Sequence, residues 1–176
     1  MAEKVPIIVH GSWRLKLDEQ KRIVFPSAIR KMLENAGEPL ELVIARNFNR
    51  SLSIYWPSLW AHTLMRATRE LTGKERYAWF SVIGPSAVNV VIPTSGKMTI
   101  PKELLEYADI DGELLLAGKV FFLEAWEPKR FQVDQEKLAK DFNQEEVASK
   151  LMQSLPYADG IDGRESSLPS RLPHHE

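Results

Sequence analysis

The sequence predicts an α+β protein with a mainly β core, built from one hairpin-plus-helix unit that occurs twice. Residues 15–30 alternate apolar and polar side chains, turn at a charged tip, alternate again and then pass through Pro26 into a helical pattern. Residues 88–106 repeat this order, with Pro101 in the place of Pro26. Helical stripes of apolar residues follow each copy, so we expect short helices within the repeats and flanking helices beside them.

The first copy begins with a half-buried strand at residues 12–17, where every second residue is apolar. A polar turn follows at residues 18–21, and the alternation resumes at residues 23–25, a pattern typical of a β-hairpin. The other elements expected in this copy are a short helix at residues 28–35 and strands at residues 41–45 and 52–55.

The second copy shows matching elements at a nearly constant offset. The prolines differ by 101 − 26 = 75 residues, whereas Trp56 and Trp126 differ by 126 − 56 = 70 residues, because one loop is shorter in the second copy. The expected elements are a strand before Pro101, a helix at residues 102–108 and strands at residues 113–117 and 120–125. Length differences confined to loops are what a structural duplication requires.

Four further helices are expected outside the repeated cores. Apolar residues recur at helical spacing between Pro57 and Leu71, and a shorter helix follows at residues 74–80. After Pro128 the same spacing returns, and a last apolar stripe ends at Leu155. The predicted domains are a first repeat at residues 11–60, connecting helices at 61–85, a second repeat at 86–131, C-terminal helices at 132–155 and a disordered tail at 156–176.

Composition excludes several kinds of site. The chain has no cysteine, which rules out disulfides, thiolate metal sites and thiol nucleophiles, and its four histidines lack zinc-ligand spacing. The sequence contains no glycine-rich phosphate loop, nucleophile elbow or clustered carboxylates. We therefore expect no catalytic residues, no metal, no cofactor and no small-molecule substrate.

Charge and hydropathy narrow the location and the partners. A net charge of -1 and a pI near 6.5 do not pull the whole molecule onto nucleic acid or an anionic membrane, so such binding needs a local basic patch. No stretch reaches the roughly 18 apolar residues of a membrane span, and the start lacks a signal-peptide pattern. The sequence thus predicts a cytoplasmic protein without a membrane partner.

The segment Asp-Glu-Gln-Lys-Arg-Ile-Val-Phe-Pro at residues 18–26, with Leu-Ser-Ile-Tyr-Trp-Pro-Ser-Leu-Trp at residues 52–60, resembles the repeat of the MraZ family. That repeat is similar to the AbrB-like, or swapped-hairpin, DNA-binding fold. Both copies are present, and the resemblance covers residues 11–131. It implies a duplicated swapped-hairpin β-barrel and a bacterial transcriptional regulator of the division and cell-wall gene cluster. It also implies a ring-like homo-oligomer that binds repeated promoter boxes of double-stranded DNA at the nucleoid.

The resemblance places the DNA contacts at the two tips. In the family each repeat carries Asp-x-x-Gly-Arg or a close variant, and its arginine is presented from a β-hairpin toward DNA. The first copy here has Asp18 and Arg22 with Lys21 in place of the glycine, and the second has Gly96 followed by Lys97. Arginine can donate two hydrogen bonds to one guanine, whereas lysine delivers charge without a planar fork. We therefore expect Arg22 to read sequence and Lys97 to hold a phosphate.

The candidate DNA-binding residues are Arg22, Lys97, Lys21, Arg14 and Lys16, and the expected turn-stabilising residues are Asp18 and Gly96. The first tip sets four cations against two carboxylates, too small an excess for tight binding by a monomer. An oligomer that presents several tips to repeated boxes raises the apparent affinity through effective concentration. We therefore expect oligomerisation to be required for function.

Two alternatives stay open. A charged tip can be simply a solvated turn that discourages edge-to-edge pairing of strands. The motif positions occupied by Lys21, Pro93 and Lys97 depart from the family pattern, which also fits a ring-forming interaction protein that has lost sequence-specific DNA binding.

Overall fold

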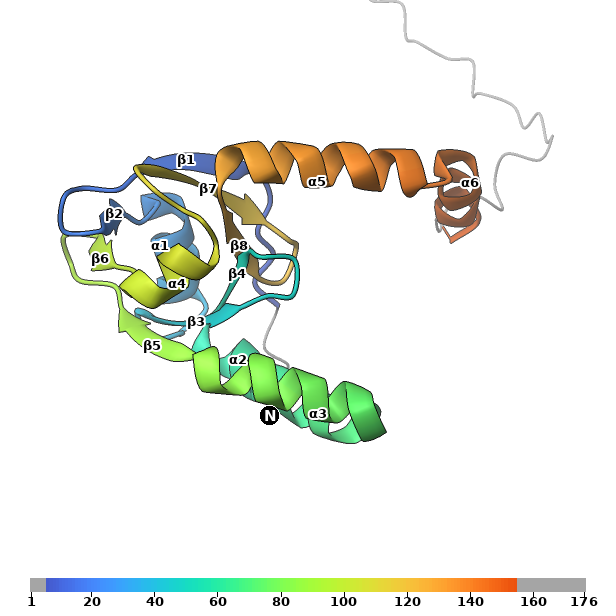
Figure 1. Cartoon of the computed structure of the whole chain (residues 1–176), viewed down its shortest axis with the longest axis horizontal. Helices are drawn as coiled ribbons and strands as arrows, with labels where there is room; N and C mark the ends of the chain where they lie inside the picture. Colours follow the sequence, from blue (N-terminus) through green and yellow to red (C-terminus); the bar gives the residue numbers. More distant parts are fainter. Residues whose placement is uncertain (1–5, 155–176) are drawn as a thin grey trace, which may run out of the picture. The chain divides into compact units, whose positions relative to one another are not determined.

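The computed structural model describes residues 6–154 and has the α+β class predicted from the sequence. The tail predicted at residues 156–176 lies outside the described residues. The chain divides into two compact units between Gln135 and Glu136, a boundary that falls within one helix. All strands of the described chain lie in the first unit (Figure 1).

The two repeats contain the same elements in the same order. The first consists of β1 (Ser12–Lys16), β2 (Arg22–Val24), α1 (Ser27–Asn35), β3 (Glu41–Arg46), β4 (Leu52–Tyr55), α2 (Pro57–Glu70) and α3 (Gly73–Val82). The second follows a 3-10 turn (Gly84–Ser86) and consists of β5 (Val88–Val91), β6 (Lys97–Thr99), α4 (Lys102–Tyr107), β7 (Glu113–Gly118), β8 (Leu123–Trp126), α5 (Pro128–Asp141) and α6 (Gln144–Ser154). The last two helices of each repeat start at one offset, 128 − 57 = 71 and 144 − 73 = 71, so the correspondence extends beyond the strands.

One strand differs in extent from the prediction. The strand expected at residues 120–125 begins at Leu123, because Val120 takes a left-handed conformation with φ 68°. The Lys119 N–H donates to the Phe122 carbonyl at 2.8 Å and closes a tight turn. The apolar run that suggested a longer strand therefore lies in a loop, where Phe121 is exposed.

Most strand pairings join one repeat to the other. β1 pairs with β7, β5 with β3 and β4 with β8, which gives a six-stranded antiparallel sheet in the order β1-β7-β8-β4-β3-β5. β2 and β6 form a separate two-stranded antiparallel ribbon. The hairpin predicted at residues 12–25 is therefore wrong in its pairing. β1 and β2 flank a tight turn, but each bonds to a strand of the second repeat.

The closed β-barrel implied by the family resemblance is not formed. β1 and β5 are the two edges of the six-stranded sheet and do not pair with each other, so the sheet stays open. The physical reason is that β2 and β6 bond only to each other within the described chain. They therefore do not bridge the edges of the larger sheet.

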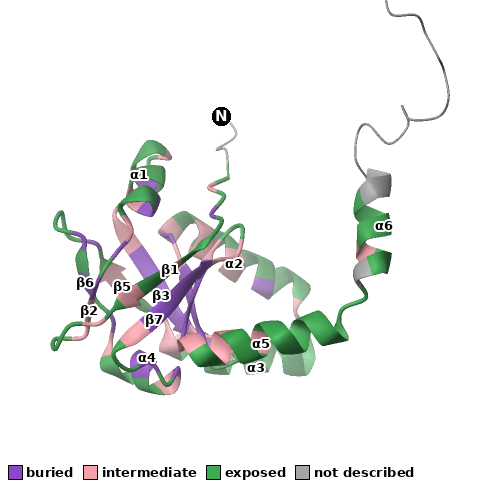
Figure 2. Cartoon of the chain, turned by 90° about the horizontal axis from the view of Figure 1, so that it is seen from above, coloured by how far each residue is buried: buried purple, intermediate pink, exposed green. Residues whose placement is uncertain are grey.

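One hydrophobic core joins the two repeats (Figure 2). The middle residue of each ribbon strand points inward, as the alternation of side chains along a strand requires. The ribbon contributes Ile23 and Met98 to this core, α1 contributes Ile29 and Leu33, and α4 contributes Leu104 and Leu105. Full burial of a side chain of this size contributes about 1.5–3 kcal/mol, and this burial holds the short ribbon against the rest of the unit.

A buried polar cluster adds a second link between the repeats. The Glu124 carboxylate on β8 accepts hydrogen bonds from Trp126 Nε1 at 2.9 Å and Asn47 Nδ2 at 3.0 Å. Lys119 Nζ lies 3.2 Å from the same carboxylate. Because a buried charge is costly unless it is paired and hydrogen-bonded, these contacts hold the turn after β3 in the first repeat against β8 in the second.

Residues 6–86 expressed alone should have no stable monomeric fold, because β1, β2 and β4 all lack strand partners when the second repeat is removed. We expect this fragment to be unfolded, or dimeric with a second copy supplying the missing strands. Far-UV circular dichroism and sedimentation velocity measure these outcomes, with the full chain as control. A monomeric fragment that unfolds cooperatively would contradict the prediction.

Candidate nucleic-acid interface

The β2–β6 ribbon brings two of the predicted site residues onto one face. In its register Arg22 lies opposite Thr99, and Val24 lies opposite Lys97. Because the middle residues point into the core, these four side chains share the outer face. Arg22 and Lys97 are diagonal neighbours, a geometry with about 7–8 Å between residues. The turns that precede the two strands project from the same end of the first unit (Figures 1 and 2).

Asp18 holds the first turn through its carboxylate. Oδ1 accepts the backbone N–H groups of Gln20 at 3.0 Å and Arg22 at 2.9 Å, and Oδ2 accepts Arg22 Nε at 2.8 Å. The hydrogen bond from the Arg22 side chain, followed by that from its backbone, lowers the pKa of Asp18 below its ordinary value. The carboxylate is therefore charged at neutral pH and stabilises the turn.

The same carboxylate orients Arg22. The Nε and Nη2 groups lie 2.8 and 2.7 Å from Asp18 Oδ2, and the arginine side chain is 35% exposed. The guanidinium edge that contains Nη1 has no hydrogen-bond partner among residues 6–154. Arg22 is thus aimed by Asp18 and electrically paired with it, while one donor edge stays open.

Lys21 occupies the glycine position of the motif in the left-handed region, with φ 57°. Its Nζ lies 3.0 Å from Oδ1 of Asp111, in the loop between α4 and β7. Its carbonyl accepts the Ile100 N–H at 3.3 Å. These contacts dock the first turn on the second repeat and place a carboxylate beside the lysine charge.

The second turn is built without an acidic residue. Gly96 has φ 75°, its N–H donates to the Pro93 carbonyl at 2.8 Å, and its carbonyl accepts the Phe25 N–H at 2.8 Å. Ser95 Oγ accepts the Lys97 N–H at 3.3 Å. The Lys97 side chain is exposed and forms no ion pair with the residues that the structure describes.

Arg14 and Lys16 lie outside the ribbon. Both are exposed on β1, the edge strand of the larger sheet. Lys16 lies opposite Glu113 in the register, and Arg14 Nη1 is 3.4 Å from Glu113 Oε1. The structure therefore unites Arg22 with Lys97 but leaves Arg14 and Lys16 on a different pair of strands.

Sequence reasoning overlooked Arg30. This residue lies on α1, and its Nη1 donates to the Thr94 carbonyl at 3.0 Å, within the second turn. A Cβ built on Gly96 would lie 3.3 Å from Arg30 Cζ, so the guanidinium packs directly against this glycine. The second repeat has Leu105 at the position equivalent to Arg30, since 105 − 30 = 75. That departure from the repeat was the available signal.

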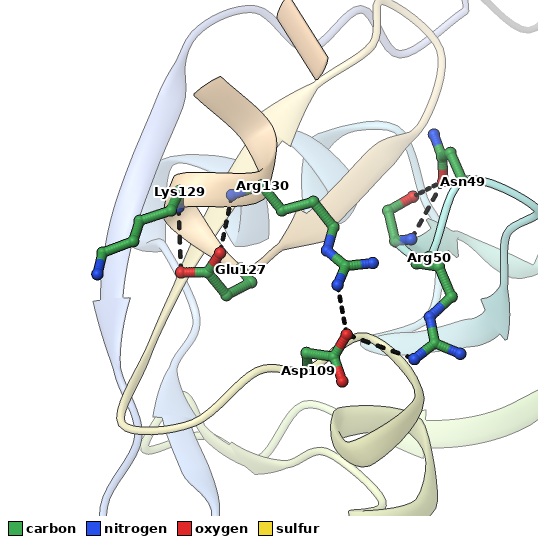
Figure 3. A network of polar contacts seen from close by, with 7 residues as sticks. Asn49, Arg50, Asp109, Glu127, Lys129 and Arg130 are labelled. Atoms are coloured by element: carbon green, nitrogen blue, oxygen red, sulfur yellow. Dashed lines mark hydrogen bonds and ion pairs between the residues drawn. The ribbon is translucent and has the colours of Figure 1, made fainter. Parts of the chain in front are cut away.

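Another group of cations surrounds the end of α4 and the start of α5 (Figure 3). Arg50 and Arg130 both bind Oδ2 of Asp109, Arg50 at 3.4 Å. The Glu127 carboxylate accepts the backbone N–H groups of Lys129 at 3.1 Å and Arg130 at 2.7 Å, which caps the start of α5. Because the two arginines share one carboxylate, this group joins α4, α5 and the turn after β3.

Across residues 6–154, no three acidic or histidine side chains gather in a way that could hold a metal ion. The described helices include none with both the length and the apolar character needed to cross a membrane.

No protein-family model matches the chain, but individual relatives do. The chain is 24% identical over 155 residues to the transcriptional regulator MraZ of Christiangramia forsetii, covering 87% of this chain and 96% of that protein. It is 28% identical over 150 residues to the MraZ regulator of Dictyoglomus thermophilum, covering 82% and 91%. The regulator of the same name from Treponema denticola is 26% identical over 137 residues, covering 76% and 92%.

Asp18→Asn should make stability less sensitive to acid. The folded-state pKa of Asp18 is lowered, so its stabilising contribution is present above the unfolded-state value of about 4 and disappears as the pH falls through the folded-state value. The variant should therefore be less stable than the wild type at neutral pH, and the two should converge at lower pH. Urea unfolding at several values between about pH 2.5 and about pH 7 measures this, with Glu19→Gln in the same turn as control. A difference that does not depend on pH would contradict the assignment.

Lys21→Gly should be more stable than Lys21→Ala by about 1 kcal/mol, because only glycine adopts a positive φ without a Cβ penalty. Both variants remove the ion pair with Asp111, so their difference isolates the backbone effect. Chemical unfolding of both proteins at one pH measures the free energies. Equal stabilities would show that the turn relaxes when the lysine is removed.

Proposed function

We propose that this chain, a member of the MraZ family by its similarity to those regulators, is a DNA-binding transcriptional regulator that uses the β2–β6 ribbon. The observation that carries the proposal is the placement of Arg22 and Lys97 as diagonal neighbours on the outer face. A two-stranded β-ribbon fits the major groove, where each base pair presents a distinct pattern of donors and acceptors. The names of the relatives support regulation of transcription as the purpose of this contact.

In this proposal Arg22 reads a base and Lys97 binds a phosphate. The open guanidinium edge of Arg22 can donate two hydrogen bonds to O6 and N7 of one guanine, which discriminates by about 1–3 kcal/mol. Asp18 holds the arginine in one orientation before DNA arrives, which lowers the conformational entropy cost of binding. Lys97 carries an exposed ammonium without a planar fork and so suits the DNA backbone.

The other cations have a lesser share in the proposed contact. Lys21 and Arg14 are each close to a carboxylate, and Lys16 lies opposite one, so their positive fields are partly cancelled. One ribbon therefore neutralises few phosphates. A ring-like homo-oligomer that sets several ribbons on repeated promoter boxes supplies the missing affinity. Such a regulator would act in the cytoplasm, at the nucleoid.

A second candidate is a ring-forming interaction protein that no longer reads DNA sequence. The observation that favours it is the pairing of Arg22 with Asp18, because a base contact must compete with this ion pair. Lys21, Pro93 and Lys97 at the motif positions favour it too. The two candidates differ in one measurable property, which is preference for a particular DNA sequence.

Fluorescence anisotropy should show tighter binding to direct-repeat DNA from upstream of the protein's own gene than to scrambled DNA of equal length. Arg22→Ala should remove most of this preference, a decrease of about 1–3 kcal/mol in discrimination. Lys97→Ala should weaken binding to both DNAs alike, because a phosphate contact carries no sequence information.

Native mass spectrometry of both variants is the control, since neither side chain is in the core and the oligomer should persist. Equal binding of the wild type to both DNAs would favour the interaction protein. Full site preference in Arg22→Ala would exclude Arg22 as the reading residue.

A further inference from the structure

We infer that the phosphate-binding charge of the ribbon lies mainly at the second turn, in Arg30 and Lys97, rather than at the arginine-bearing first turn. This inference rests on the proposed function and names the part of the interface that holds the DNA backbone. It also reverses the expectation from sequence, in which the first tip carries more of the cations.

The cations of the first turn are already paired. Arg22 donates twice to Asp18, and Lys21 lies 3.0 Å from Asp111. Each pair must be broken or shared before its cation can neutralise a phosphate. Ion pairs of this exposure are worth about 0–1 kcal/mol, so they do not prevent contact with DNA, but they cancel most of the field that would attract it.

The second turn carries two cations that no described carboxylate opposes. Arg30 and Lys97 form no ion pair within residues 6–154. Arg30 Nη1 donates to the Thr94 carbonyl, and its buried Nε has no hydrogen-bond partner in the described chain. A neutral carbonyl leaves the guanidinium charge in place. The second turn is therefore the more positive end of the ribbon.

Arg30 also positions this turn. Its guanidinium lies against Gly96, where a Cβ would come within 3.3 Å of Cζ and 3.5 Å of Nε. The hydrogen bond to Thr94 fixes the turn from the side of α1, and Lys97 follows directly after Gly96. Arg30 thus contributes its own charge and holds the backbone from which the Lys97 ammonium extends.

Phosphate oxygen is the ligand chemistry that fits these two cations. Arg30 is only partly exposed and is held by its hydrogen bond to the turn, so it is not free to extend to a base edge. Lys97 lacks the planar fork that a guanine contact uses. A pair of cations at the end of a ribbon matches the regular spacing of negative charge along a DNA strand.

The salt dependence of binding to scrambled duplex DNA tests the inference, because the slope of log K against log salt changes by about 0.9 for each phosphate that the protein neutralises. Arg30→Leu installs the residue of the equivalent position in the other repeat. Both it and Lys97→Ala should lower the magnitude of the slope by about 0.9 for each subunit bound. Arg30→Lys keeps the charge and should keep most of the slope. Lys31→Ala removes an exposed cation from the same helix and should leave the slope unchanged, as should Lys21→Ala.

Amide hydrogen exchange in the absence of DNA tests the positioning role separately. The Gly96 and Lys97 amides should exchange faster in Arg30→Leu than in Lys31→Ala, because the leucine cannot form the hydrogen bond that links α1 to Thr94. Unchanged exchange would overturn the positioning role, whatever the protein binds.

The outcomes separate this inference from the proposed function. Slopes that depend on Arg30 and Lys97, without any preference for repeated boxes, would support the inference and refute sequence-specific regulation. A wild type that prefers the boxes, with slopes that respond to Lys21→Ala but not to Arg30→Leu, would refute the inference and leave the function standing. No binding of either DNA at low salt would overturn both.

Discussion

The antiparallel pairing of β2 with β6 is the constraint on which the rest of the site depends. Each strand is three residues long and bonds to a strand of the opposite repeat, so neither repeat builds the ribbon alone. An isolated two-stranded ribbon is marginal in water, and here Ile23 and Met98 anchor it in a core shared by both repeats. The register of this pairing is what makes Arg22 and Lys97 neighbours although they are 97 − 22 = 75 residues apart in the chain.

The exchange of strands also explains how two similar turns acquired different charge. Each turn is docked on the opposite repeat, but the chemistry is inverted. At the first turn Lys21 extends toward Asp111, and a carboxylate of the second repeat answers its charge. At the second turn Arg30 comes from the first repeat and meets the Thr94 carbonyl, which is neutral. Equivalent geometry therefore produces one neutralised tip and one cationic tip.

Sequence patterns located most elements because they depend on local spacing. Alternation placed the strands, and proline and glycine marked where the short helices begin and end. The pattern did not reveal pairing, since a local hairpin and an exchanged pair bury the same face of β2. The strand expected from Val120 failed for a local reason, because a left-handed residue turned an apolar run into a loop. The family resemblance implied exchanged strands, and it also implied a barrel that the open sheet does not close.

The sequence by itself determined the duplication, the α+β class and the identity of the residues at the two tips, because these follow from spacing and residue type. Only the tertiary structure decided which strands pair and which cations are neutralised. Coulomb energy depends on distance in space, and Lys21 and Asp111 are 90 residues apart in the chain but 3.0 Å apart at their charged atoms. The importance of Arg30 has the same origin, since no local pattern on α1 shows that its guanidinium reaches the turn at Gly96.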